Sequence, residues 1–145
     1  MQSYTISALS PDKIDQAYPV AMLAIPDLAL ERWRSACRAG EDGGFLVALD
    51  PSGHIRGLCQ VSVVATDGGV QALQVTSLAF ATALDVRGVA DAMLDALIRL
   101  CGRRRCSRLA ISVAVDRSGA FRALARARDQ VATSYAGLRI DLLTP

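Results

Sequence analysis

Residues 85–92, Asp-Val-Arg-Gly-Val-Ala-Asp-Ala, form the segment whose residue types best fit a chemical task. They follow a strand-forming stretch and precede a helical apolar pattern, so we expect a helix to begin here. Small residues at Gly88, Ala90 and Ala92 would let a phosphate approach the backbone. The positive end of a helix favours an anion, and Arg87 adds a full charge. The segment could bind phosphate, or it could simply be the tight turn that starts an alanine-rich helix.

The sequence offers little for metal or covalent chemistry. Its single histidine, His54, ends a turn-forming segment over residues 50–54. One histidine cannot build a His-rich zinc site, and we expect neither a metal nor a Ser-His-Asp triad. The four cysteines show no Cys-x-x-Cys spacing, so we interpret them as free thiols.

The first half of the chain predicts a strand, two helices and an antiparallel hairpin. Ser10 and Pro11 are typical of a helix start, and Pro19 should kink or divide that helix. Asp27 can cap a second helix, which should end at Gly40. The turn chemistry of residues 50–53 separates two stretches rich in strand formers. The strands expected here span residues 4–8, 45–49 and 55–65.

The second half predicts a crossover between parallel strands. A strand over 70–80, whose mixed pattern indicates burial on both faces or a bulge, leads to a helix from Val89 that ends before Gly102. The next strand, 109–115, should pair with it in parallel through a right-handed connection. A helix over 118–127 and two strands, 131–135 and 138–143, complete the chain. We expect an α/β (α+β) fold with four helices and a mixed central sheet of about seven strands, the parallel pair at its centre.

Composition predicts one globular domain over residues 1–145. Hydrophobic residues make up 52% of the chain and the formal charge is +2, which excludes a disordered polypeptide and argues against a dedicated nucleic-acid binder. No apolar run reaches the roughly 18 residues of a membrane span, and the start lacks a signal-peptide pattern. We expect a cytoplasmic protein. The run 103–105, three arginines, could meet an acidic partner or nucleic acid, but it is more typical of a solvated helix end.

The order of these elements and their residues together resemble the GNAT family of acyl-CoA-dependent N-acyltransferases, over nearly the whole chain. In that family a pyrophosphate loop, Q/R-x-x-G-x-G/A, joins the fourth strand to the third helix, and residues 87–92, Arg-Gly-Val-Ala-Asp-Ala, fall on it. Residues 77–80 look like the strand beside the pantetheine. Residues 44–48 and 53–57 resemble the second and third strands. Residues 115–124 resemble the segment V-x-x-N-x-x-A-i-x-L-Y.

The resemblance implies acetyl-CoA as cosubstrate and an amine-bearing acceptor. It also implies that the strand after the crossover splays from its neighbour, near Phe80 and Ser112, to admit the pantetheine arm. The residues that it assigns to the cofactor are Leu78, Phe80, Arg87, Gly88, Val89, Ala90 and Ala92.

The sequence departs from the family pattern where chemistry is concerned. Ala90 replaces the first glycine of the loop, and Asp91 puts a carboxylate next to the expected phosphates. Leu124 stands where the family often has the tyrosine that protonates the departing thiolate, a role that an aliphatic side chain cannot fill. Arg117 stands where an asparagine often lies beside the cofactor.

No catalytic residue is identified from the sequence. The strand 70–80 contains no carboxylate, and the nearest candidates for a general base, Asp116 and Tyr135, could equally serve as a cap or in packing. The sequence predicts an N-acetyltransferase that moves the acetyl group of acetyl-CoA to a primary amine. The alternative is a catalytically inactive GNAT-fold ligand-binding or interaction module, which could form a homodimer.

Overall fold

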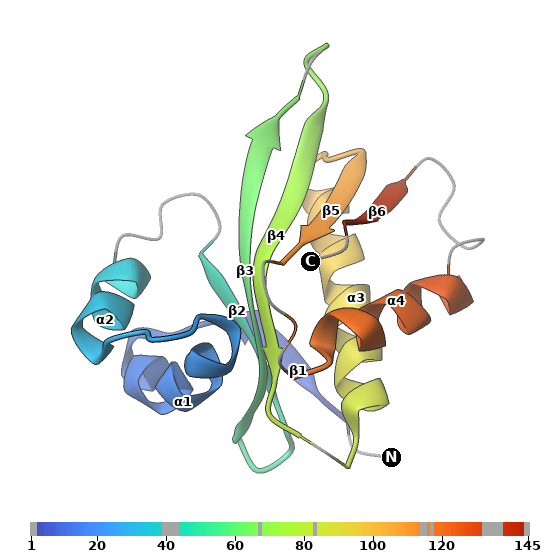
Figure 1. Ribbon diagram of the computed structural model, residues 1–145. Coiled ribbons are helices and arrows are strands. Elements are labelled where there is room, and N and C mark those ends of the chain that lie inside the picture. The colour runs from blue at the N-terminus through green and yellow to red at the C-terminus, as the bar shows by residue number, and fades with distance from the viewer. Residues whose placement is uncertain are drawn as a thin grey trace.

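A six-stranded mixed sheet carries helices on both faces (Figure 1). The computed structural model describes residues 3–38, 44–66, 68–82, 84–113, 116, 118–131 and 138–143. The strands are β1 (Thr5–Ala8), β2 (Phe45–Leu49), β3 (Ile55–Ala65), β4 (Gln71–Phe80), β5 (Arg108–Ser112) and β6 (Arg139–Leu143). The helices are α1 (Ile14–Ala24), which follows a 3-10 turn over Pro11–Lys13, α2 (Leu30–Arg38), α3 (Val86–Arg103) and α4 (Ala120–Val131).

The strands lie in sequence order, and the pairing changes from antiparallel to parallel at β4. β1 to β4 form an antiparallel meander, whereas β5 is parallel to β4. The predicted parallel pair is therefore confirmed. β6 is also parallel to β5, because α4 lies between them in the chain. Of the expected strand 131–135, Val131 is instead the last residue of α4, and residues 132–135 lie outside the described ones.

A β-bulge interrupts the pairing of β3 with β4. Gln60 lies opposite Ser77, but the next residue, Val61, lies opposite Val75. Thr76 is thus an extra residue on β4. An extra residue reverses the alternation of side chains along a strand.

Because of the bulge, odd-numbered residues before it and even-numbered residues after it point to the same face of β4 and share one core. Leu73 and Val75 precede it, Leu78 and Phe80 follow it, and all four belong to the cluster beneath α3 and α4. Both expected explanations of the mixed pattern therefore hold, because Ala79, between Leu78 and Phe80, is buried in the core on the opposite face.

A second core lies on the opposite face, beneath α1 and α2 (Figure 1). Trp33 of α2 is fully buried there. The centroids of its ring and that of Phe45 are 4.7 Å apart, in an edge-to-face arrangement. The Nε1 of Trp33 donates a 2.7 Å hydrogen bond to the carbonyl of Ile14. The indole therefore joins α2 to both α1 and the sheet.

The helices α1 and α2 differ in part from the sequence-based expectation. Of the two effects expected of Pro19, a kink or a division of the helix, the division is absent, since α1 runs unbroken from Ile14 to Ala24. Asp27 does not cap α2, because it adopts a left-handed conformation (φ 59°) and the first helical hydrogen bond is accepted by Ala29. α2 ends at Arg38, and the expected stop at Gly40 lies outside the described residues. No helix within the described ranges is long and apolar enough to cross a membrane.

Candidate functional site

The start of α3 is fixed by the carboxylate of Asp85. Its Oδ1 accepts a 3.2 Å hydrogen bond from the backbone N–H of Gly88, and its carbonyl accepts one from Val89. This is an N-cap, so α3 begins at Val86, earlier than the apolar pattern predicts. A Cβ on Gly88 would lie 2.5 Å from Asp85 Oδ2, which explains why this position holds glycine.

Tyr4 ties the same carboxylate to the edge of the sheet. Its hydroxyl donates a 2.8 Å hydrogen bond to Asp85 Oδ2. Burial and this hydrogen bond raise the pKa of Tyr4 above its ordinary value. The N–H of Gly88 is thus already bound to an anionic side chain, whereas those of Val86 and Arg87 come before the first intrahelical hydrogen bond. Residue-type preferences could have revealed Asp85, since aspartate is a favoured N-cap.

A cavity of about 380 Å³ lies between the first turns of α3 and the face of α4. We call it the α3–α4 cavity. It brings Arg87 of α3 and Arg126 of α4 to one place, together with the carboxylate of Asp91. The remaining lining residues are Leu84, Val86, Ala123 and Ala127. Two guanidinium groups against one carboxylate make this lining positive, so an anion is the ligand that it favours.

The other predicted cofactor residues are distributed differently. Leu78, Phe80, Val89 and Ala90 are buried in the core, so they can meet a ligand only through their backbone. Ala92 lies on the side of α3 that faces β1, away from the α3–α4 cavity. The structure therefore brings the predicted residue Arg87 to the cavity but not Ala92.

Close packing holds the end of β4 against the start of α3. A Cβ on Gly57 of β3 would lie 3.0 Å from Val89 Cγ1 and 3.2 Å from Phe80 Cδ1. Gly57 thus leaves room for both side chains. As a result, the tip of β4 and the first turn of α3 share one rigid contact.

β4 and β5 part beyond the bulge. Their pairing runs from Ala72 opposite Arg108 to Val75 opposite Ile111, and β5 ends at Ser112. The rest of β4 has no partner on β5 within the described residues, and the N–H of Phe80 instead donates to Ser118 Oγ at 3.1 Å. This divergence agrees with the expected splaying of the two strands.

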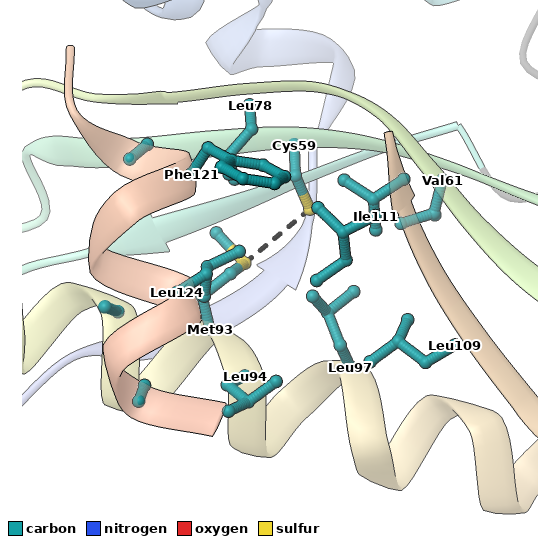
Figure 2. Packing of buried hydrophobic residues seen from close by; sticks show 14 of the residues in the cluster. Cys59, Val61, Leu78, Met93, Leu94, Leu97, Leu109, Ile111, Phe121 and Leu124 are labelled. Atoms are coloured by element: carbon teal, nitrogen blue, oxygen red, sulfur yellow. Dashed lines mark hydrogen bonds between the residues drawn. The ribbon is translucent and has the colours of Figure 1, made fainter. Parts of the chain in front are cut away.

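The candidate acid and base positions have structural roles. Leu124 is fully buried, in the same cluster as Met93 and Phe121 (Figure 2). The carboxylate of Asp116 accepts hydrogen bonds from the N–H groups of Phe121 (3.0 Å) and Arg122 (3.3 Å), so it caps α4. The other base candidate, Tyr135, lies outside the described residues, as does Arg117, the residue in place of the asparagine that often lies beside the cofactor.

The thiols are held in their protonated form. Burial raises the pKa of Cys59 and Cys101 to about 12 and that of Cys37 to about 11. Cys59 lies against the sulfur of Met93 at 3.6 Å (Figure 2). A thiol with such a pKa is a poor nucleophile at neutral pH. The described parts of the chain gather no group of three or more potential metal ligands.

The contact between Asp85 and Gly88 leads to a testable prediction. Gly88→Ala should lower the free energy of unfolding by about 1–2 kcal/mol, because the new methyl group would displace the Asp85 cap. In an Asp85→Ala background the same change should be neutral or stabilising by up to about 1 kcal/mol, since alanine is the better helix former. Urea unfolding of the four proteins measures both effects, and additive losses would contradict the proposed clash.

The sequence matches the model of the acetyltransferase (GNAT) family over residues 10–128. A search of curated proteins gave no match.

Solved structures share the fold at low sequence identity. An aminoglycoside N-acetyltransferase in complex with CoA has a TM-score of 0.65 and 11% identity, covering 100% of this chain and 96% of its own. An aminoglycoside antibiotic 6'-N-acetyltransferase from Acinetobacter baumannii has a TM-score of 0.66 and 12% identity, covering 99% and 98%. A ribosomal-protein-alanine N-acetyltransferase from Brucella melitensis biovar Abortus 2308 has a TM-score of 0.63 and 15% identity, covering 99% and 98%.

Proposed function

The chain belongs to the GNAT acetyltransferase family, and from this premise we propose that it transfers an acetyl group from acetyl-CoA to a primary amine. The observation that carries the proposal is the α3–α4 cavity, whose lining contains Arg87 from the first turn of α3 and Arg126 from α4. Coenzyme A carries a diphosphate and a further phosphate, and guanidinium groups bind phosphate oxygens in pairs of hydrogen bonds. The solved relative that contains CoA supports this choice of ligand.

In this proposal the chain binds and orients acetyl-CoA rather than reacting with it covalently. Arg87 and Arg126 hold phosphates, and the backbone of Leu78 and Phe80 borders the pantetheine arm where β4 parts from β5. Bound acetyl-CoA supplies an activated thioester. Holding an amine beside it removes much of the entropic barrier to the reaction.

Two protons must move during the transfer. The amine nitrogen attacks the carbonyl carbon and loses a proton, the C–S bond breaks, and the departing thiolate gains a proton. Leu124 cannot supply that proton, because its side chain is aliphatic and fully buried. In the proposed mechanism water carries protons at both steps.

Binding of acetyl-CoA can be tested without knowing the acceptor. A ligand bound only by the folded state adds about 2.7 kcal/mol of stability at a hundredfold excess over Kd, which for this chain length corresponds to a Tm increase of roughly 5–10 °C. Arg87→Ala and Arg126→Ala should each reduce the increase, and Asp91→Asn should enlarge it by removing a like charge from the cavity. Thermal unfolding with and without acetyl-CoA measures the shift.

A matched control is Arg32→Ala, which removes an exposed arginine from α2 on the opposite face of the sheet. This variant should retain the full shift. If millimolar acetyl-CoA leaves the melting curves of both the wild type and Asp91→Asn unchanged, the transferase proposal is wrong.

The second candidate function is a ligand-binding or interaction module without catalysis. Three features favour it: the buried aliphatic Leu124, the carboxylate of Asp91 in the cavity, and the Asp85 carboxylate already bound to Gly88. Release of the CoA thiol in the presence of a panel of primary amines separates the two functions. A protein that binds acetyl-CoA but releases no thiol with any of the amines is a module.

A further inference from the structure

A second hollow lies on the same face of the sheet, beside the C-terminal half of α3. Its volume is about 220 Å³, and strands β1 to β4 form its floor. We call it the β1–α3 hollow. Ala96 of α3 forms part of its wall. Its apolar lining is entirely aliphatic: Ile6, Leu46, Val61, Val63, Leu73 and Leu100.

One end of the hollow is positively charged. Arg103 and Arg104 line it, and neither takes part in an ion pair with any residue that the structure describes. An adjoining cavity of about 420 Å³ shares Arg103 with the hollow. The acidic residue of that cavity, Asp95, is already paired with Arg99 at 2.9 Å. Among the described residues, no carboxylate is therefore paired with Arg103 or Arg104.

The guanidinium groups of the two arginines are not needed to cap α3. The N–H of Arg104 donates to the carbonyl of Leu100 at 2.9 Å, and that of Cys106 donates to Cys101 at 2.8 Å. The last carbonyl groups of the helix are thus bound by backbone donors. The favourable interaction of cations with a helix C-terminus remains, but it does not explain an aliphatic hollow next to them.

We propose that the β1–α3 hollow binds an aliphatic carboxylate, with its chain on the apolar floor and its carboxylate against Arg103 and Arg104. A guanidinium group binds a carboxylate through paired, charge-assisted hydrogen bonds. A cavity of about 150 Å³ in another protein binds benzene, which has six carbon atoms, so a hollow of about 220 Å³ is large enough for a chain of about seven carbon atoms. The ligand class is a medium-chain fatty carboxylate, and the site is separate from the α3–α4 cavity.

Octanoate is the probe that tests this site, with binding measured by calorimetry on the full chain. Arg103→Gln and Arg104→Gln should each weaken binding by about tenfold or more, because each removes a charged hydrogen-bond donor. The matched control is the neighbouring Arg105→Gln, which removes the same charge from a residue outside the lining and should leave binding unchanged. Ala96→Phe should abolish binding by filling the hollow, and circular dichroism would verify that this variant is folded.

Two other ligands test separately the contribution of the aliphatic chain and that of the carboxylate. Butyrate has four fewer methylene groups, each of which should contribute about fourfold to binding, so it should bind too weakly to detect. Octylamine carries the opposite charge and should not bind.

The proposal is overturned if octanoate does not bind at 10 mM, a probe concentration on the order of that needed for weak ligands. It is also overturned if octylamine binds as well as octanoate, or if Arg105→Gln weakens binding as much as Arg103→Gln. Weakening by Arg87→Ala would instead place the ligand in the α3–α4 cavity. Acetyl-CoA binding is measured separately, by the melting shift, so the octanoate site can fail while the acetyl-CoA proposal stands.

Discussion

Replacing Leu124 with alanine is expected to lower the free energy of unfolding by about 2–5 kcal/mol. Leu124 is fully buried in the main core, among Met93, Leu94 and Phe121 (Figure 2). Removing three carbon atoms there loses their burial and leaves a cavity that the helices and the sheet can only partly close. Urea unfolding followed by circular dichroism measures the loss.

Leu124→Tyr tests the effect of a larger side chain at this position. A larger side chain in a filled core costs about 1–3 kcal/mol, and a buried hydroxyl needs a hydrogen-bond partner. Leu124→Met, which conserves volume, should cost less than about 1.5 kcal/mol. If Leu124→Tyr were as stable as the wild type and raised the rate of acetyl transfer, Leu124 would instead border the reacting thioester.

Trp33→Ala should have an effect of similar size, about 3–5 kcal/mol. The indole is fully buried, contacts Phe45 edge to face and donates a hydrogen bond to Ile14. Its loss would empty the centre of the smaller core and leave the carbonyl of Ile14 without this donor. Because Trp33 is the single tryptophan, circular dichroism rather than intrinsic tryptophan fluorescence should follow the unfolding.

Trp33→Phe separates packing from the hydrogen bond. It keeps an aromatic ring against Phe45 but loses the Nε1 donor, so the expected cost is smaller, about 1–3 kcal/mol. Equal losses for Trp33→Phe and Trp33→Ala would mean that the hydrogen bond to Ile14, and not the ring, holds α2 in place.

The sequence was sufficient to predict the crossover, because a helix between two strands of one sheet leaves little choice of connection. It was not sufficient to locate the bulge. Nothing in the sequence around Thr76 marks it as an extra residue. The bulge is identified only in the structure, where Thr76 has no partner on β3. The end of α4 was also missed. Residues 128–131, Arg-Asp-Gln-Val, contain no glycine or proline to stop a helix, and the helix continues through them to Val131.

The candidate site was partly predictable for a similar reason. Arg87 belongs to a local pattern around a helix start, which a sequence displays directly. Arg126 comes from α4 and reaches the cavity only through the packing of α4 against α3. Asp85 is an aspartate just before the helix, which is typical of an N-cap, but phosphate binding is indicated by cations and small residues, and an acidic side chain does not fit that pattern. The cytoplasmic location and the single domain over residues 1–145 stay predictions.

The hydrogen bond from Tyr4 to Asp85 has a consequence for the order of folding. The two residues are 81 positions apart in the chain, so this bond closes a long loop. Closing such a loop costs more conformational entropy than forming a turn of helix, and contacts of this range usually form late. The first turn of α3 can form early as a helix, because its N-cap, Asp85, is close to it in the chain. Its final position, however, depends on the edge strand β1, so the start of α3 becomes fixed in place only when β1 has joined the sheet.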